Sequence, residues 1–469
     1  MVSIMFKRVL VANRGEIAVR VIRALGEMGI ESVAIYSNVD KGALHTRLAD
    51  YAICLDGDRV QETYSNIEKI VEMAKVSGCD AIHPGYGFLA ERPKFAEAVE
   101  KAGITFIGPK SEIISLMGDK IEARKCMISL GIPVIKGSNS AIETFKEASE
   151  IAEEIGYPVL VKAAAGGGGM GMKIATNSEE LEFILDTVRS TALSLFADGT
   201  VFLEKYLVRP RHIEVQIMGD KHGNYIHLGE RECSIQRRNM KIVEESPSIA
   251  ISSEIREEMC KAAVTIAKSV GYTSVGTVEF IYENGEFFFL EMNTRIQVEH
   301  TITEMVTSVD IVKEQISIAV GKALSLKQED VKFTGHSIEC RIYAEDPNNS
   351  FMPSPGEITN CIMPGGPGIR IDSGIIAGYT VSAHYDPMLA KLITYGRDRE
   401  EAVSRMYRAL REYYIEGIKT NIPLLMAIMK DKDFKECDIS TKYLEEKGAL
   451  INNSHSERKT VYISIENSN

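Results

Sequence analysis

Short apolar runs alternate with longer amphipathic segments over the first hundred residues of the chain. The short runs are rich in Val, Ile and Ala and predict strands at residues 9–12, 33–36, 81–82 and 105–107. The longer segments repeat apolar residues at helical spacing and predict helices at residues 17–29, 67–77 and 94–102. Strands separated by helices of this length are typical of βαβ units, so we expect a parallel sheet in the N-terminal part of the chain.

Beyond Gly108 the pattern changes, because longer β-like runs follow one another and helices mix with them. Helical spacing recurs at residues 111–130, 143–156 and 178–195. Strand-like runs are predicted at residues 158–162, 172–175, 200–206, 212–218, 225–231, 275–282 and 286–292. This mixture indicates a second domain of the α+β class.

A third domain is expected from about Gly335. It begins with the alternating run 336–344, which predicts a strand, and it ends in helices predicted at 399–414 and 424–430. Residues 450–469 are polar, and we expect them to form a mobile tail.

Length and charge limit the functions open to such a chain. Its 469 residues are enough for about three domains. The 54 basic and 66 acidic residues leave a formal net charge of −12, so we expect neither nucleic acid nor an anionic membrane as a partner. No apolar run approaches the ~18 residues of a membrane span. The eight cysteines are scattered without a CxxC pair, which is typical of reduced thiols and predicts a cytoplasmic protein.

Four consecutive glycines, Gly166 to Gly169, lie between two predicted strands. They expose backbone N–H groups and let the chain close over an anion. No GK[ST] follows, which excludes a Walker A loop, and no helix opens directly behind, which excludes the dinucleotide fingerprint. A flexible hairpin tip explains the glycines equally well. Lys162 and Lys120 could pair with nucleotide phosphates, although single lysines are more often solvated.

Two strand-like runs flank Asn284 and Gly285, and each run carries a carboxylate, Glu279 or Glu291. Asn293 lies two residues beyond Glu291 and shares its face. A two-residue loop would pair position 279 with 290 and send the two carboxylates to opposite faces. A three-residue loop, with Gly285 in the left-handed region, would make them diagonal neighbours. We predict the three-residue loop, because only that register gathers oxygen ligands for a hard cation. The alternative is a pair of solvated carboxylates.

Arg295, Gln297 and Glu299 follow directly and would project to one side of an extended chain. A cation and a carboxylate beside a metal–nucleotide could bind a small anion and move a proton. A polar turn with an ordinary ion pair is the alternative. Lys241 and Arg341 could add positive charge to such a site or decorate the surface.

The chain resembles the biotin carboxylases of the ATP-grasp superfamily from about residue 5 to residue 447. The stretches that match include Glu291-Met-Asn-Thr-Arg-Ile-Gln-Val-Glu-His300, Ala12-Asn-Arg-Gly-Glu-Ile-Ala18, His83-Pro-Gly-Tyr-Gly-Phe-Leu89 and Arg231-Glu-Cys-Ser-Ile-Gln-Arg-Arg238. The resemblance implies an α/β and α+β fold of three parts. These are a Rossmann-like parallel-sheet domain over 1–115, an ATP-grasp domain over 116–334 with a mobile glycine-rich lid at about 137–207, and a C-terminal biotin carboxylase domain over 335–449.

The resemblance further implies ATP- and bicarbonate-dependent carboxylation of biotin through carboxyphosphate, the first half-reaction of a biotin-dependent carboxylase. The implied ATP contacts are Lys120, Lys162, Gly168, Gly169, Glu204, Lys205, Tyr206, Leu207, His212, Gln236, Asn239, Glu279 and Glu291. The implied ligands of Mg²⁺ or Mn²⁺ are Glu279, Glu291 and Asn293. The implied bicarbonate and biotin contacts are Lys241, Arg295, Gln297, Val298 and Arg341. Glu299 would be the base toward bicarbonate, and Lys241, Arg295 and Arg341 would join it in catalysis.

The implied partners are a second copy of the chain, a biotin carboxyl carrier protein or biotinylated subunit, and a carboxyltransferase subunit. Arg23 and Arg370 match the dimer contact of the family. Four positions depart from the family's usual residues: Met170 in the glycine loop, Asn239 and Met240 on the nucleotide side, and Pro367 in the segment of the dimer contact. The chain has no Met-Lys-Met biotinylation motif, so we expect the carrier to be a separate chain. The final acceptor stays open among acetyl-CoA, propionyl-CoA and pyruvate.

Two other functions remain open at this point. One is an ATP-grasp ligase of another kind that forms an acyl phosphate, such as a carbamoyl-phosphate or purine-pathway enzyme. The other is a nucleotide sensor without catalytic activity. The run from Arg295 to Glu299 and the strand of Arg341 argue against the first, and the intact metal and proton-transfer residues argue against the second.

Overall fold

The computed structural model describes residues 5–138, 140–164, 171–196 and 198–448. The glycine loop with Gly168 and Gly169 and the predicted tail at 450–469 lie outside these ranges. Within them, no helix is long and apolar enough to cross a membrane.

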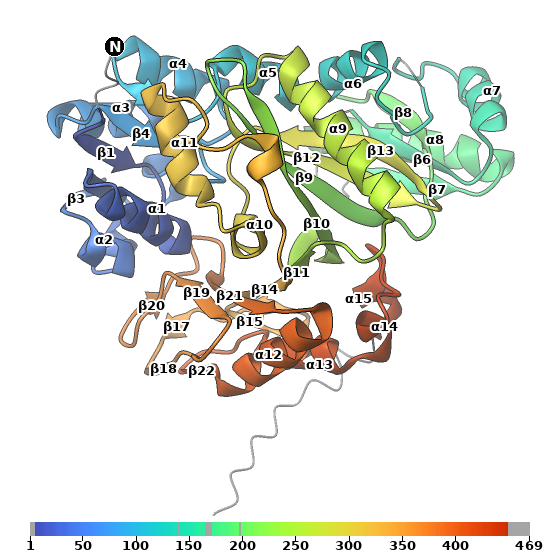
Figure 1. Cartoon of the computed structure of the whole chain (residues 1–469). Coiled ribbons are helices and arrows are strands. Elements are labelled where there is room, and N and C mark those ends of the chain that lie inside the picture. The colour runs from blue at the N-terminus through green and yellow to red at the C-terminus, as the bar shows by residue number, and fades with distance from the viewer. Residues whose placement is uncertain (1–4, 139, 165–170, 197, 449–469) are drawn as a thin grey trace, which may run out of the picture.

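The N-terminal part forms the expected parallel sheet (Figure 1). Its strands are β1 (Arg8–Val11), β2 (Glu31–Tyr36), β3 (Tyr51–Cys54), β4 (Ala81–His83) and β5 (Thr105–Phe106), in the order β3-β2-β1-β4-β5. Its helices are α1 (Gly15–Glu27), α2 (Leu44–Leu48), α3 (Ile67–Val76) and α4 (Pro93–Lys101). The strand order reverses between β1 and β4, so the loops that follow these two strands meet. Asn13 after β1 joins them by donating to the carbonyls of Pro84 and Tyr86 at 2.8 and 2.7 Å.

A second, eight-stranded sheet crosses the middle of the molecule (Figure 1). Its strands are β9 (Arg211–Gly219), β10 (Tyr225–Arg237), β11 (Met240–Ser246), β12 (Ser274–Glu283), β13 (Glu286–Asn293), β14 (His336–Tyr343), β19 (Ile369–Ser373) and β21 (Met388–Gly396). The order is β13-β12-β9-β10-β11-β14-β21-β19, and neighbouring strands are antiparallel. The strands that follow residue 335 therefore extend the sheet of the preceding segment by direct hydrogen bonding between β11 and β14.

The two faces of this sheet differ in character. Ile213, Val215 and Ile217 of β9 pack into a core with α9 (Ser253–Ser269). The intervening residues of β9 point to the opposite face, as alternation in a strand requires. That face is polar, and α10 (His300–Thr307) approaches it. The next helix, α11 (Ile311–Val320), packs with α1 in a core shared with the N-terminal sheet.

A smaller sheet stands at one side of the molecule. It consists of β6 (Val159–Ala163), β7 (Met172–Ala175) and β8 (Val201–Lys205), covered by α7 (Phe145–Ile155) and α8 (Ser178–Phe196). The single helical stretch predicted at 111–130 is in fact two helices, α5 (Ser111–Gly118) and α6 (Lys120–Ser129). The chain breaks at Asp119, whose carboxylate accepts hydrogen bonds from the first N–H groups of α6.

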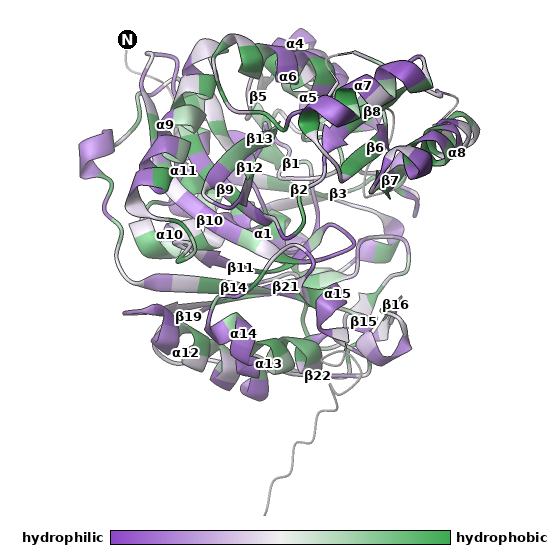
Figure 2. Cartoon of the chain, turned by 90° about the vertical axis from the view of Figure 1, so that its right-hand side faces the viewer, coloured by the Kyte–Doolittle hydropathy of each residue, from purple (hydrophilic) through white to green (hydrophobic). Residues whose placement is uncertain are grey.

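The C-terminal helices α12 (Arg399–Glu412) and α13 (Ile422–Lys430) cover the β14–β21 end of the large sheet, followed by α14 (Lys432–Lys435) and α15 (Tyr443–Glu446). Short pairs complete this part: β15 (Glu345–Asp346) with β16 (Met352–Pro353), β17 (Gly356–Glu357) with β20 (Thr380–Val381), and β18 (Asn360–Ile362) with β22 (Tyr414–Glu416). Outer helices such as α8 and α12 carry both hydrophilic and hydrophobic positions (Figure 2), as expected for helices with one face on a core. The predicted fold class, a parallel sheet followed by mixed α+β parts, is confirmed.

Candidate active site

The β12–β13 hairpin corrects one prediction and still brings the two carboxylates together. Glu283 pairs with Glu286 across a two-residue turn, in which Asn284 and Gly285 have φ of 53° and 87°. The predicted three-residue loop is therefore wrong. The register then shifts between Glu279 and Phe280, so that Phe280 pairs with Phe289 and Glu279 with Glu291. The extra residue, Leu290, forms a bulge that returns both carboxylates to one face.

Four charged side chains form a row across the polar face of the large sheet. Glu291 of β13 pairs with Glu279 of β12, Glu279 pairs with Glu214 of β9, and Glu214 pairs with Arg231 of β10. Directly opposite residues of antiparallel strands point to the same side. Three carboxylates in one row repel one another, so the row requires cations.

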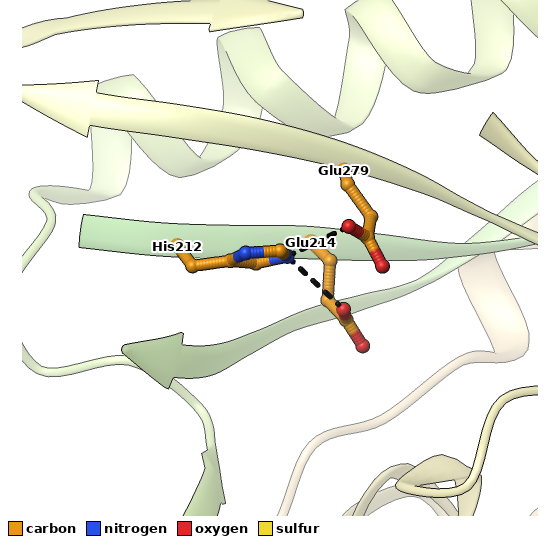
Figure 3. A group of neighbouring side chains, drawn as sticks. All are labelled: His212, Glu214 and Glu279. Carbon is orange, nitrogen blue, oxygen red and sulfur yellow. Dashed lines mark ion pairs between the residues drawn. The ribbon is translucent and has the colours of Figure 1, made fainter. Parts of the chain in front are cut away.

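His212 supplies one of these cations, and Figure 3 shows it facing both Glu279 and Glu214. Its Nε2 lies 3.0 Å from a Glu279 oxygen and 3.7 Å from a Glu214 oxygen. Burial lowers the pKa of His212, but the carboxylates outweigh it and raise the pKa to about 9. The two carboxylates therefore favour the charged form of the imidazole.

Lys241 of β11 supplies a second cation at the centre of the cluster. Its ammonium lies 2.5 Å from Glu214, 2.9 Å from Glu279 and 2.6 Å from Glu299. Burial opposes the charged form, yet these carboxylates hold the pKa of Lys241 well above its usual value. Gln297 joins from the side, with its amide donating to Glu279 at 2.7 Å.

Glu279 and Glu291 lie directly opposite each other on neighbouring strands, a pair of carboxylates that could bind a divalent cation. Burial, and then repulsion by Glu279, raise the pKa of Glu291, so a cation beside it would stabilise its ionised form. Asn293 lies within reach and donates to Glu279 at 2.9 Å. The ligand atoms of His212, Glu214 and Glu279 also lie within 4.8 Å of one another. Glu214 thus belongs to the site, although the sequence pattern did not single it out.

Glu299 is held ionised beside this pair. Burial and Glu214 raise its pKa, but Lys241 and Arg341 lower it below its usual value. Arg341 contacts Glu299 at 3.1 Å and Glu244 at 2.5 Å. A buried carboxylate that stays charged can accept a proton from a bound substrate.

The run that carries Glu299 is not extended, contrary to the premise used to place its side chains. The chain bends at 294–295 and turns at 298–299 before α10 begins. Gln297 and Glu299 still converge on Lys241. Arg295 turns instead to Glu91 at 2.9 Å and to Asn293 at 2.8 Å.

Several other predicted nucleotide contacts lie on or beside the small sheet. Lys162 of β6 pairs with Glu204 of β8, and Lys205 donates to the carbonyls of Gly156 and Tyr157 at 2.9 and 3.1 Å. The ring of Tyr206, which precedes Leu207, lies 4.6 Å from the ammonium of Lys442.

Gln236 hydrogen-bonds the second ring nitrogen of His212 at 3.1 Å. Asn239 occupies the β10–β11 turn with a φ of 64°. Lys120, the first residue of α6, is close enough to lower the pKa of Glu291. Gln236 and Lys120 therefore lie against the cluster, whereas Lys162, Glu204, Lys205 and Tyr206 make their contacts within the small sheet and its neighbours.

Arg231, fully buried, is a second residue that the sequence pattern did not single out. Its guanidinium donates to Glu214 at 2.6 Å, to Gln216 at 2.8 Å, and to Thr277 and Thr303 at 3.0 Å each. The signal for this network was present in the sequence, since His212, Glu214 and Gln216 alternate with apolar residues along one strand. A polar face on an otherwise apolar strand indicates buried partners.

Comparison with known proteins extends over nearly the whole chain. Family models match residues 5–114 (biotin carboxylase, N-terminal domain), 119–327 (carbamoyl-phosphate synthase L chain, ATP binding domain) and 339–446 (biotin carboxylase C-terminal domain). Biotin carboxylase 1 of Bacillus subtilis is 54% identical over 94% of this chain and 98% of its own length. A pyruvate carboxylase subunit of Methanothermobacter thermautotrophicus is 52% identical over 94% of this chain and 90% of its own.

A solved structure agrees as well. The biotin carboxylase domain dimer of Hydrogenobacter thermophilus 2-oxoglutarate carboxylase, in complex with MgADP, ADP and bicarbonate, superimposes with a TM-score of 0.90. It is 51% identical, and the match covers 96% of this chain and 99% of that one.

Proposed function

The chain belongs to the biotin carboxylase family and is an ATP-dependent ligase that carboxylates biotin with bicarbonate, and we propose that the cluster around Lys241 is where this reaction occurs. The observation that carries the proposal is the ammonium of Lys241, which lies within 3 Å of both Glu279 and Glu299. The ammonium of Lys241 thereby connects Glu279, which is suited to binding a metal–nucleotide, with Glu299, which is suited to acting as a base.

We assign the first chemical step to Glu299. It takes the proton of bicarbonate, and the bicarbonate oxygen then attacks the γ-phosphorus of ATP, giving carboxyphosphate and ADP. Lys241 and Gln297 would hold the anion, while Lys120 and Lys162 would face the phosphates. Mg²⁺ held by Glu279, Glu291 and Asn293 would neutralise polyphosphate charge.

The second step transfers the carboxyl group. Carboxyphosphate breaks down to CO₂ and phosphate, the phosphate takes the N1 proton of biotin, and N1 then attacks CO₂. Arg295 would stabilise the negative charge on the biotin oxygen, and Arg341 would contact biotin or phosphate. Both guanidinium groups are permanently charged and border the cluster, which suits them to this role.

The enzyme works with partner subunits of a biotin-dependent carboxylase, and we propose which they are. The carrier would be a separate biotinylated chain, and the carboxyl group would pass to an acceptor on a carboxyltransferase subunit. Two copies of this chain would associate through the surface of Arg23 and Arg370. Arg370 pairs with Glu304, which also pairs with Arg20 of the same helix as Arg23. The free cysteines agree with a reducing compartment, the cytoplasm.

Release of ADP by the purified chain tests the proposed function. We expect release that depends on bicarbonate and Mg²⁺ and rises with free biotin. Glu299→Gln should lower the rate about 100-fold or more, because the base is lost. Glu245→Gln is the matched control, since Glu245 is equally buried and ion-paired but contacts Arg399 and His336 instead.

The competing functions predict other results. A ligase with a different acceptor would release ADP without a response to biotin, and a sensor would bind ATP without turnover. No stimulation by biotin, together with a Glu299→Gln variant as active as the parent, would refute the proposal.

A further inference from the structure

Lys391 of β21 is a fully buried lysine that none of the steps above uses. A buried ammonium is costly unless it is paired and hydrogen-bonded. Its Nζ lies 3.1 Å from an oxygen of Glu16 and donates to the backbone carbonyl of Val298 at 2.8 Å. One of its two close partners is therefore the carbonyl group of Val298, the residue between Gln297 and Glu299.

The contact joins three segments that are far apart in the sequence. Glu16 lies in the first turn of α1, Val298 in the turn before α10, and Lys391 in the large sheet. The hydroxyl of Tyr86, from the loop after β4, donates to the other oxygen of Glu16. Glu16 and Val298 thus contact the ammonium of Lys391 directly, and Tyr86 is connected to it through Glu16.

The distance between α1 and the sheet has little freedom to change. A Cβ atom built on Gly374, just beyond β19, would lie only 2.7 Å from the backbone nitrogen of Glu16. Real Cβ atoms do not approach so closely, so only glycine permits this packing. The backbone of Glu16 is therefore packed against Gly374, while Tyr86 and Lys391 contact its carboxylate.

We propose that Lys391 is a positioning residue for the bicarbonate site, an inference that rests on the proposed function. Its ammonium holds the Val298 carbonyl and thereby sets the backbone on which Gln297 and Glu299 converge toward Lys241. Glu16 acts behind it as the anion that keeps the ammonium charged and in place.

Two roles of Lys391 can be separated by mutation. Balancing the charge of Glu16 is a structural role, whereas holding Val298 is a positioning role. Lys391→Met removes both and leaves Glu16 uncompensated. Glu16→Gln/Lys391→Met also lacks the hold on Val298 but contains no buried charge at this pair. Glu16→Gln alone keeps the ammonium and its bond to Val298.

The experiment measures the KM for bicarbonate, the KM for ATP and the melting temperature of the full-length chain and these three variants. We expect Lys391→Met to raise the KM for bicarbonate about tenfold, because a hydrogen bond from a charged donor is lost, with a smaller change in the KM for ATP. The double variant should recover melting temperature but keep the raised KM. Glu16→Gln should show a smaller rise in KM.

Arg399→Met is the control for destabilisation alone, because Arg399 pairs with buried Glu245 in the same region and has no bond to Val298. It should melt lower while its KM for bicarbonate stays that of the parent. A KM that returns to the parent value with the melting temperature in the double variant would overturn the inference. A parent without bicarbonate-dependent ADP release would overturn the proposed function as well, whereas an active parent and an unchanged Lys391→Met variant would overturn the inference alone.

Discussion

Replacing Arg231 by methionine should destabilise the protein strongly and impair catalysis. Methionine fills much of the same volume but removes the guanidinium that donates to Glu214, Gln216, Thr277 and Thr303. These partners lie on β9, β12 and α10, so one side chain connects three elements of the polar face. Each of these four side chains would lose a hydrogen-bond donor, and all four are buried away from water.

The size of the effect follows from the burial of the pair. Arg231 and Glu214 both have fully buried side chains at 2.6 Å. Removing one partner of such a pair costs about 3–5 kcal/mol, mostly because the other charge is left behind. Lys241 still compensates part of the Glu214 charge, so we expect about 3 kcal/mol. For a chain of 469 residues that unfolds as one unit, the unfolding entropy is about 1 kcal/mol/K, so this loss lowers the melting temperature by about 3 °C.

Thermal unfolding followed by circular dichroism measures this change, and ADP release at 25 °C measures its effect on the site. The double variant Glu214→Gln/Arg231→Met should melt higher than Arg231→Met, because it contains no unpaired buried carboxylate at this position. A melting temperature of Arg231→Met within about 1 °C of the parent would refute the reasoning. So would a double variant that is less stable than Arg231→Met, since the cost would then not come from the Glu214 charge.

Three further predictions concern the Glu279–Glu291 pair, a buried carboxylate and Gly137, which packs against β8. Glu291→Gln should raise the Mg²⁺ concentration for half-maximal ADP release about tenfold, because a carboxylate ligand is lost. It should not lower the melting temperature in metal-free buffer, because the change also relieves repulsion with Glu279. An unchanged Mg²⁺ dependence would contradict the prediction. Burial alone would raise the pKa of Glu245, but a neighbouring imidazole and guanidinium lower it to about 2. The ionised carboxylate of Glu245 therefore adds about 3 kcal/mol to the free energy of unfolding at pH 7, and this contribution is lost as the pH falls from about 5 toward 2. The free energies of unfolding of the parent and of Glu245→Gln, measured by urea titration, should converge over that pH range. A constant difference between them would argue against this prediction. In Gly137→Ala the new Cβ would lie 2.3 Å from the carbonyl oxygen of Leu203, so β8 must shift. The KM for ATP should then rise about tenfold. An unchanged KM would show that β8 can shift without affecting ATP binding.

Local patterns in the sequence were sufficient for much of the fold. The parallel N-terminal sheet and most strands of the large sheet lie where apolar runs predict them, because burial on one or both faces leaves a periodic trace in the residues themselves. The missed elements include short ones such as α2 and β3, whose patterns are weak. They also include β11, β19 and β21 of the large sheet and the helices α9, α10 and α11, which the sequence pattern did not single out. The break at Asp119 was also missed, although a capping residue within a long helical pattern is a readable signal.

Both the sequence and the tertiary structure were needed to establish which site residues lie together. Glu279 and Glu291 were expected on one face, and they are, but through a bulge at Leu290 rather than through a longer loop. The sequence does not distinguish these routes, because a bulge far from the turn and an extra loop residue move the register equally. Arg295 was expected beside Gln297 and Glu299, and only the bend of the chain shows that it turns to Glu91.

The sequence by itself determined which chemical groups this protein has and how they are spaced along its strands. It also determined the family, because the motif from Glu291 to His300 keeps the proposed metal, anion and proton-transfer residues together. Only the tertiary structure decided that Glu214 and Arg231 complete the carboxylate row and that Lys391 lies beneath Val298. Those contacts join residues up to hundreds of positions apart, and pairing across such distances depends on register, burial and charge compensation, none of which a local pattern records.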